Sequence, residues 1–316
     1  SINGLVFGTV YNITYQYDGN LKAEIDAELQ KFNLSLNPFN PNSIIAKVNN
    51  NEPVEVDEWF TEVFNKSMEV SRNSDGVFDI TCAPLINLWG FGFSKKDSVT
   101  PAMIDSLKTF VGYRKVHLKD KKIVKDDPRL LLNCSAIAKG FSCDVIARLL
   151  EKEGVENYMI LIGGEVVVKG VNQNGQCWRT GINLPEEDPT GTKNNYDEIV
   201  QLCKKGAIAT SGNYRNFYIK DGKKYAHTID PRTGYPAEQS VLSATIVADD
   251  CMTADAYATA FMAMGLEKAR QMADSLPEIE YYVIYADENG KHRIEYSKGM
   301  LPYLPKRKTM ISPDNS

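Results

Sequence analysis

The sequence lacks any long apolar run. A helix that spans a membrane needs roughly 18 consecutive apolar residues, whereas the longest candidate, Ala256 to Gly265, is shorter and contains Thr259. We therefore expect no membrane-spanning helix. No leader pattern stands at the beginning either. Ser1 is typical of a mature or trimmed chain, from which an export signal could already have been removed.

Cysteine pairs of the CxxC type are also missing, which argues against a zinc site. There are six cysteines in all: Cys82, Cys134, Cys143, Cys177, Cys203 and Cys251. An even number permits disulfides without requiring them, and we expect scattered, small, buried thiols. Cysteine usage therefore leaves the cellular compartment open.

Several common catalytic motifs are absent, and so is an excess of positive charge. The chain contains no GxSxG, HExxH or GxGxxG pattern, which removes the enzyme classes built on them. Lysine and arginine number 36 against 41 aspartate and glutamate residues, for a net charge of −5. Proteins that hold nucleic acid usually need a basic surface, so we expect no nucleic-acid partner.

What the sequence does contain is a mixture of helix and strand patterns without a regular βαβ rhythm. Apolar residues recur at helical spacing in four segments, at about 21–32, 57–71, 137–149 and 252–264. Strand patterns occupy residues 7–17, 155–170, 206–230, 241–248, 281–285 and 293–296. We read the Asn- and Pro-rich residues 33–51 as a loop. The mixture predicts an α+β fold, with residues 1–316 in one domain that could have two lobes and a loosely packed tail at about 299–316.

A histidine beside a stiff turn is the first candidate for chemistry. Only three histidines are present, and His227 stands directly before a turn that contains Asp230, Arg232 and two prolines. A histidine exchanges a proton near neutral pH, and the two charged residues could orient it or bind an anion. The segment could equally be a structural turn, in which Asp230 bonds the backbone.

A second candidate is the start of the helix at 252–264. Asp255 and Thr259 are four residues apart and share one helix face. A carboxylate and a hydroxyl are oxygen ligands that suit Mg²⁺, although two are too few for a full site. Alternatively, Asp255 is simply favoured near a helix N-terminus.

Small residues mark three further places where a ligand could approach the backbone. One is the helix start Asn133–Gly140, whose amides and Lys139 could attract phosphate, although it is not a Walker motif. The others are Ile162–Glu165 and Ala209–Asn216, where glycines stand beside polar residues at strand ends. Each of the three could also be plain packing or a turn.

Together these segments resemble the ApbE family of FAD:protein FMN transferases. Ser74–Thr81 followed by Pro84–Gly92 is similar to the family signature, and Gly8–Tyr11 resembles its opening block. The later blocks match in order: Ser135–Gly140, Ile162–Glu165, Ala209–Asn216, His227–Gly234 and Met252–Ala256. The resemblance covers roughly residues 7 to 285, and so many ordered blocks make chance an implausible explanation.

The resemblance implies an α+β, T-fold-like architecture of mixed sheets flanked by helices, with FAD held in a nucleotide cleft. It implies an enzyme that takes FAD as its substrate and cleaves the pyrophosphate with Mg²⁺. FMN then passes to a threonine hydroxyl of an acceptor protein, and AMP leaves. Family acceptors include subunits of respiratory complexes. Many members are extracytoplasmic lipoproteins, so we expect a place on the periplasmic side of the inner membrane and a lipid anchor in the full-length protein.

The family's site residues carry over to matching positions of this chain. The resemblance implies three Mg²⁺ ligands, namely the carbonyl oxygen of Ala136 and the side chains of Asp255 and Thr259. It implies that Lys139 lies near the phosphates and that His227 deprotonates the acceptor hydroxyl. The residues expected to line the flavin nucleotide are Phe7, Asn37, Ser211, Tyr214 and Ile229.

Asn37 departs from the family pattern, which often has tyrosine there. A tyrosine would stack on the flavin, so asparagine should hold FAD less tightly and let water reach the phosphate. We therefore expect FAD diphosphatase activity beside transfer, unless Asn37 simply caps the turn that it forms with Pro38. Other interpretations are a protein that mainly hydrolyses FAD, a flavin-binding protein without turnover, and a cofactor-free interaction protein. The presence of His227 and Asp255 disfavours the flavin-binding protein without turnover, and the ordered motif blocks disfavour the cofactor-free interaction protein.

Overall fold

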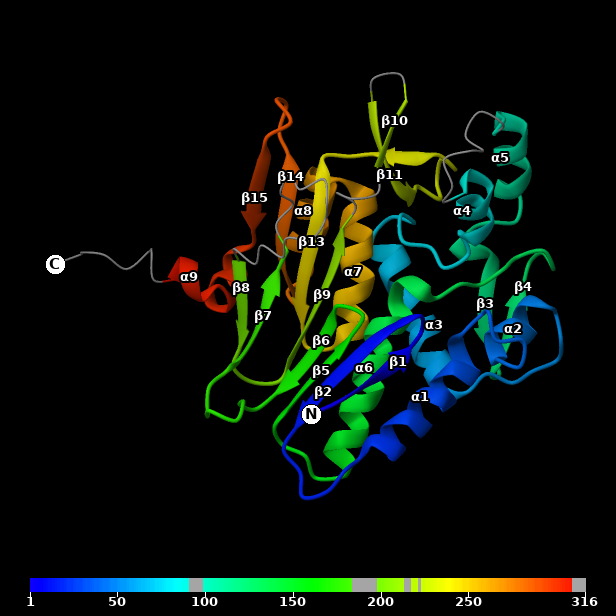
Figure 1. Cartoon of the computed structure of the whole chain (residues 1–316). Helices are drawn as coiled ribbons and strands as arrows, with labels where there is room; N and C mark the ends of the chain where they lie inside the picture. Colours follow the sequence, from blue (N-terminus) through cyan, green and yellow to red (C-terminus); the bar gives the residue numbers. More distant parts are fainter. Residues whose placement is uncertain (91–98, 184–197, 213–216, 221–222, 309–316) are drawn as a thin grey trace.

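A computed structural model describes residues 1–90, 99–183, 198–212, 217–220 and 223–308. Its centre is an antiparallel eight-stranded sheet with the order β1-β2-β5-β6-β9-β13-β14-β15 (Figure 1). The strands are β1 (Ile2–Val6), β2 (Thr9–Tyr15), β5 (Tyr158–Ile162), β6 (Glu165–Lys169), β9 (Gly206–Gly212), β13 (Val241–Ala248), β14 (Ile279–Ala286) and β15 (His292–Tyr296). Antiparallel strands combined with separate helices confirm the predicted α+β fold.

Helices cover one face of this sheet, with α6 and α7 packed directly on its central strands (Figure 1). The longer helices are α1 (Lys22–Leu36), α3 (Glu58–Asn73), α6 (Ser135–Lys152), α7 (Cys251–Met264) and α8 (Leu266–Asp274). Asp57 caps α3 by accepting a hydrogen bond from the amide of Phe60 at 2.8 Å, as its position before the apolar stripe predicts. The four predicted helices, α1, α3, α6 and α7, are confirmed, whereas α8 was not predicted.

The opposite face of the sheet is closed by a β-hairpin and the C-terminal segment. The hairpin comprises β7 (Trp178–Ile182) and β8 (Glu198–Leu202), and the segment forms η3 (Lys298–Tyr303) and α9 (Pro305–Lys308). The sequence predicts a loose tail from residue 299, but Met300 and Leu304 are fully buried in the apolar cluster under this face. Residues 298–308 are therefore packed, while 309–316 lie outside the described residues.

Smaller elements complete the chain at one end of the sheet (Figure 1). The small strands are β3 (Val116–Lys119), β4 (Lys122–Lys125), β10 (Phe217–Lys220), β11 (Lys223–Ile229) and β12 (Pro236–Glu238). The short helices are α2 (Ile44–Asn49), α4 (Ala83–Trp89), α5 (Pro101–Lys108) and η2 (Tyr113–Lys115). Beneath α4 and α5 lies a separate small apolar cluster that includes Ile229.

Two further interpretations of the sequence are wrong. Residues 33–51 are not one loop, because α1 continues to Leu36 and α2 begins after Ser43, whose hydroxyl accepts the amide of Ala46. Buried apolar residues outweigh the local asparagines and prolines there. The cysteines are not all free either, since Cys177 and Cys203 form a disulfide across the β7–β8 hairpin. The remaining four cysteines are buried thiols.

No helix in the described parts of the chain combines the length and the apolarity needed to cross a membrane, as the sequence predicts.

Candidate active site

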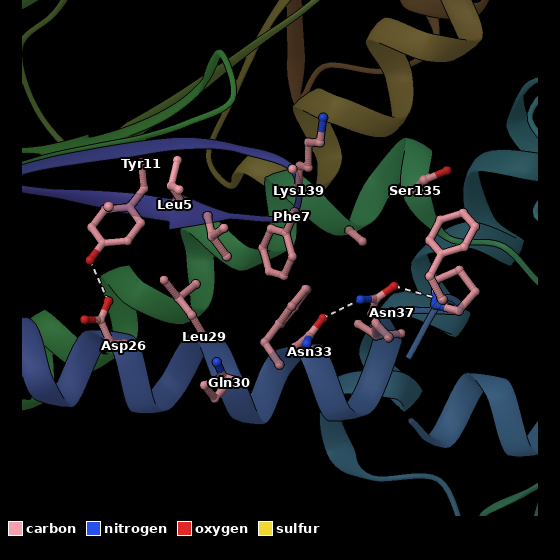
Figure 2. Close-up of a pocket in the computed structure, with 18 of the residues that line it drawn as sticks. Leu5, Phe7, Tyr11, Asp26, Leu29, Gln30, Asn33, Asn37, Ser135 and Lys139 are labelled. Carbon is pink, nitrogen blue, oxygen red and sulfur yellow. Dashed lines mark hydrogen bonds between the residues drawn. The ribbon is translucent and has the colours of Figure 1, made fainter. Parts of the chain in front are cut away.

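A cavity of about 800 Å³ lies between the β1–β2 hairpin and α1, with the start of α6 beside it. Its volume falls within the roughly 300–1,000 Å³ of small-molecule sites. Figure 2 shows Tyr11 and Asp26 at one end and Asn33 and Asn37 at the other. Asn37, the C-cap of α1, follows Asp26 by eleven positions, which gives this side of the groove a length of about 16 Å. The cavity is thus long and narrow enough to receive an extended ligand.

Phe7 forms the apolar wall near the middle of this groove (Figure 2). It lies in the tight turn between β1 and β2, with a left-handed φ of 51° that a bulky residue rarely adopts. The next residue, Gly8, also has a positive φ. The ring of Phe7 packs on Phe32 of α1 at 5.3 Å between centroids. The strained turn therefore holds an aromatic ring over the groove.

Asn37 lines the far end of the groove and ends α1. Its side-chain amide donates to Asn33 Oδ1 at 2.6 Å, and its Oδ1 accepts the amide of Phe39 at 3.0 Å. The predicted turn cap is therefore confirmed. Asn37 both shapes the turn and presents a small polar surface to the cavity.

Lys139 lies in the second turn of α6 and also lines the cavity. The turn between β5 and β6 makes room for it, because a Cβ at Gly163 would lie 3.5 Å from Lys139 Cδ and 3.1 Å from the Thr9 methyl. Gly163 has a φ of +60°, which favours glycine. A helix start with an adjacent ammonium group can bind phosphate, as predicted.

Asp255 and Thr259 lie on α7, where it crosses α6. Asp255 is buried, and its Oδ2 accepts the amide of Gly140 at 2.9 Å. A regular helix would direct that amide at the carbonyl of Ala136, so the carboxylate lies beside the turn that carries this carbonyl. The Thr259 hydroxyl donates to the Asp255 carbonyl at 3.2 Å. The structure thus brings the three predicted metal ligands into one neighbourhood.

The close crossing of α6 and α7 depends on Gly140. A Cβ there would lie 2.3 Å from the carbonyl oxygen of Cys251 and 2.7 Å from Asp255 Cβ. Asp144, one turn further along α6, accepts the amides of Cys251 and Met252 at 2.8 and 2.9 Å. These contacts fix the position of α7 relative to α6, and hence that of Asp255 relative to Ala136.

Acidic groups at this crossing have perturbed pKa values. Burial, followed by the charge of Glu165, holds the pKa of Asp255 well above its usual range. Burial raises the pKa of Glu165 to about 7, and the positive charge of Lys139 opposes that rise. The sequence marks the segment Ile162–Glu165 only as a place of close backbone approach and does not single out Glu165. No local pattern could have done so, because its neighbours come from two distant helices.

Of the remaining predicted site residues, the described side chains of Ser211 and Ile229 do not line this cavity. Ser211 on β9 pairs with Ala244 of β13. Ile229 at the end of β11 is buried among Cys82, Leu85 and other residues of the small cluster, which is a packing role. His227 lies two residues earlier on β11, where the structure describes its backbone alone. Tyr214 lies outside the described residues.

The turn after β11 is anchored by charge pairs and by an indole. Arg232 donates to both carboxylate oxygens of Asp230, at 3.1 and 3.0 Å, and to Asp75 at 3.3 Å. The indole of Trp89 donates to the carbonyl of Gly234 at 2.7 Å. These contacts join the turn to the segment after α3 and to α4, and they fix the end of the strand that carries His227.

Comparison with known proteins identifies relatives along nearly the whole chain. The model of the ApbE family matches residues 7–283. The FAD:protein FMN transferase of Vibrio cholerae is 35% identical over 96% of this chain and 92% of its own length. Its counterpart from Salmonella typhimurium is 32% identical over 86% of this chain and 80% of its own length.

Solved structures agree with the sequence matches. The flavin transferase ApbE from Vibrio cholerae superposes with a TM-score of 0.84 at 33% identity, covering 96% of this chain and 98% of that one. The apo form of the Pseudomonas stutzeri flavinyl transferase ApbE gives a TM-score of 0.84 at 26% identity, with 96% and 95% covered. The family model and the close full-length relatives lead to one conclusion: this chain belongs to the ApbE family.

Proposed function

We propose that this protein transfers FMN from FAD to a hydroxyl group of an acceptor protein and releases AMP. The observation that carries the proposal is the groove between the β1–β2 hairpin and α1, which has Lys139 at its side and the Asp255 cluster nearby. Relatives named FAD:protein FMN transferase that match most of the chain support the same reaction. FAD would lie along the groove with its pyrophosphate toward Lys139.

Mg²⁺ would be held by Asp255, Thr259 and the carbonyl of Ala136. The donors fit this ion, because all three are oxygens and Asp255 has one oxygen, Oδ1, without a hydrogen bond in the described part of the chain. When bound, the ion would neutralise negative charge on the pyrophosphate as the bond to AMP breaks. Lys139 would add a second positive charge on the side of the groove.

His227 would act as the general base. A hydroxyl is a poor nucleophile until a base takes its proton. In the proposed reaction the hydroxyl oxygen bonds to the FMN phosphorus, its proton goes to His227, and AMP leaves with the electrons of the broken P–O bond. The acceptor residue is proposed to be threonine in a flavinylation motif, on a subunit of a respiratory complex, as the family resemblance implies.

A second activity, hydrolysis of FAD to FMN and AMP, is proposed because of Asn37. This residue occupies the groove end with a small amide that is already engaged with Asn33 and Phe39. A side chain of this size leaves more of the groove open to water than an aromatic ring would. Water could then replace the acceptor hydroxyl as the nucleophile.

We also propose that the protein works outside the cytoplasm, on the periplasmic side of the inner membrane and held there by a lipid anchor. The disulfide between Cys177 and Cys203 supports an oxidising compartment, because such bonds are rare where thiols are kept reduced. Cell fractionation of the full-length protein tests this location. Recovery in the cytoplasmic fraction would refute it.

Mass spectrometry of an acceptor domain incubated with the protein, FAD and Mg²⁺ tests the proposed transfer. We expect an FMN adduct on a threonine of the acceptor and at least an equal amount of AMP, because hydrolysis of FAD releases AMP as well. FMN and AMP without an adduct would favour hydrolysis as the main activity. Intact FAD under all conditions would refute both.

A further inference from the structure

Glu165 is a buried acid with an unexplained oxygen. It begins β6 directly after the turn at Gly163 and Gly164, and it is only 7% exposed. Its Oε2 is fully buried and has no hydrogen-bond partner within the described chain. Burying a carboxylate oxygen without a donor is costly, so a structural role alone does not account for this side chain.

The orientation of β6 places Glu165 on the helix-covered face of the sheet. Val167, two residues further on, packs in the cluster beneath α6, whereas Val166 and Val168 pack in the cluster on the opposite face. Side chains of a strand alternate between faces, so Glu165 shares the face of Val167. It therefore lies on the same side of the sheet as α6 and α7.

Two charged residues from these helices interact electrostatically with Glu165. The positive charge of Lys139 on α6 favours the ionised form of Glu165, and the carboxylate of Asp255 on α7 repels it. Lys139 runs close to the turn that precedes Glu165, and Gly140 binds Asp255. Two buried acids thus share one lysine, which also lines the groove.

Other buried acids nearby show how the fold normally treats such groups. Asp144 accepts two backbone amides at the start of α7. Glu198, on the other side of the sheet, is 3% exposed and accepts from the hydroxyl of Tyr282 at 2.8 Å and from Arg307. Glu165 has no comparable set of donors for Oε2. A cation beside Glu165 and Asp255 would remove the repulsion and supply the missing partner.

We propose that Glu165 is a second carboxylate of the Mg²⁺ site, acting on the ion directly or through a water molecule that the ion holds. The inference rests on the proposed metal site at Asp255. Mg²⁺ usually keeps several waters and binds through one or two carboxylates, so a site with Asp255 and Glu165 suits it. Acids that orient metal-bound groups typically change metal affinity 10- to 100-fold when they are removed.

Metal binding without FAD tests this directly, with Mn²⁺ as the spectroscopic probe and Mg²⁺ as its competitor. The variants are Glu165→Gln, Glu165→Asp and Asp255→Asn. Glu198→Gln is the matched control, because it makes the same change to a buried glutamate on the far face. Circular dichroism and thermal unfolding establish that each variant folds.

We expect the wild type and Glu198→Gln to bind Mn²⁺ with the same affinity. Glu165→Gln should bind it about 10- to 100-fold more weakly, and Glu165→Asp should fall between the two. The rise in Tm on adding Mg²⁺ should shrink in Glu165→Gln, because weaker metal binding stabilises the folded state less.

Wild-type affinity in Glu165→Gln together with lost affinity in Asp255→Asn would overturn the role of Glu165 and leave the proposed metal site intact. No Mn²⁺ binding by the wild type, or unchanged binding by Asp255→Asn, would overturn the proposed metal site and the inference with it. If Glu165→Gln fails to fold, the intermediate affinity expected of Glu165→Asp decides.

Discussion

The two faces of the central sheet bury glutamates in opposite situations. On the face closed by β7, β8 and the C-terminal segment, Glu198 receives hydrogen bonds from Tyr282 and Arg307. On the helix-covered face, Glu165 has a buried oxygen without a donor in the described chain. Where the fold uses a buried acid for stability it supplies the partners. Their absence near Asp255 indicates a place built for a charged ligand.

We expect the largest difference between the two faces from Asp255→Asn, which should affect activity without affecting stability. Loss of the buried charge should remove Mg²⁺ binding and reduce FAD cleavage on the order of 1,000-fold, because the metal contributes several kcal/mol to such reactions. Stability without metal should not decrease, because burial already disfavours the charged form of Asp255. Chromatographic separation of FAD, FMN and AMP measures the cleavage. Cleavage at the wild-type rate and Mg²⁺ dependence would show that the metal lies elsewhere.

His227→Ala should slow the transfer of FMN without weakening the binding of FAD in the groove. General-base catalysis typically contributes a factor of 10² to 10⁴, so we expect transfer to an acceptor threonine to fall by at least about 100-fold. FAD affinity, measured by flavin fluorescence, should change little, because the proposed role of His227 is to take a proton from the acceptor hydroxyl and not to hold FAD. Transfer at the normal rate by this variant would contradict its assignment as the base.

Glu198→Ala should have the reverse pattern on the other face. Removing this acid leaves the Tyr282 hydroxyl and the Arg307 guanidinium without their acceptor. Because Arg307 is partly exposed and can turn to water, we expect a loss of about 2 kcal/mol in the free energy of unfolding. Urea denaturation measures that loss. FAD cleavage per folded molecule should stay at the wild-type level. A fall of tenfold or more would contradict the purely structural role of Glu198 on its face of the sheet.

Gly140→Ala should lower both the stability of the fold and the affinity of the proposed metal site. The new methyl group would meet the carbonyl of Cys251 and the Cβ of Asp255, so the helices must separate at a cost of about 1–3 kcal/mol. Mn²⁺ affinity should fall in the same variant, because Ala136 and Asp255 move apart. Ala147→Gly, on the same helix but away from the site, serves as a control. An unchanged Mn²⁺ affinity in Gly140→Ala would show that the crossing does not set the metal site.

The smallest effect is expected from Asn37→Tyr. An aromatic ring at the groove end should stack on FAD and add about 1 kcal/mol to binding, which is roughly a fivefold gain in affinity. Hydrolysis of FAD in the absence of an acceptor should slow, because the ring limits access of water. Equilibrium binding and FMN release measure the two effects. Unchanged values for both would refute the stacking interpretation.

Much of the fold could be predicted from local pattern. The stripe of α3 and its cap at Asp57 are confirmed, because apolar period and cap lie within one short segment. Residues 33–51 could not be predicted in the same way, since burial of Ile45 and Val48 against distant residues decides their structure. The Cys177–Cys203 pair was likewise invisible, because it depends on the register of β7 and β8.

The candidate site, like the fold, could be predicted from the sequence only in part. Phe7, Asn37 and Lys139 follow from the family resemblance, and the structure places all three at one cavity. Glu165 does not stand out in the sequence, because its significance comes from a missing hydrogen bond and from two helices far away in the chain. Sequence motifs can indicate which residues bind a ligand, but only the folded structure shows which buried polar group lacks a hydrogen-bond partner.

The most direct measurement is the anomalous scattering of Mn²⁺ in crystals of the wild-type protein. We expect one strong peak about 2.1 Å from an oxygen of Asp255, within reach of the Ala136 carbonyl and on the side of Glu165. In crystals of Glu165→Gln this peak should weaken or vanish. A strong wild-type peak at any other place, with none beside Asp255, would contradict the assignment of the metal site.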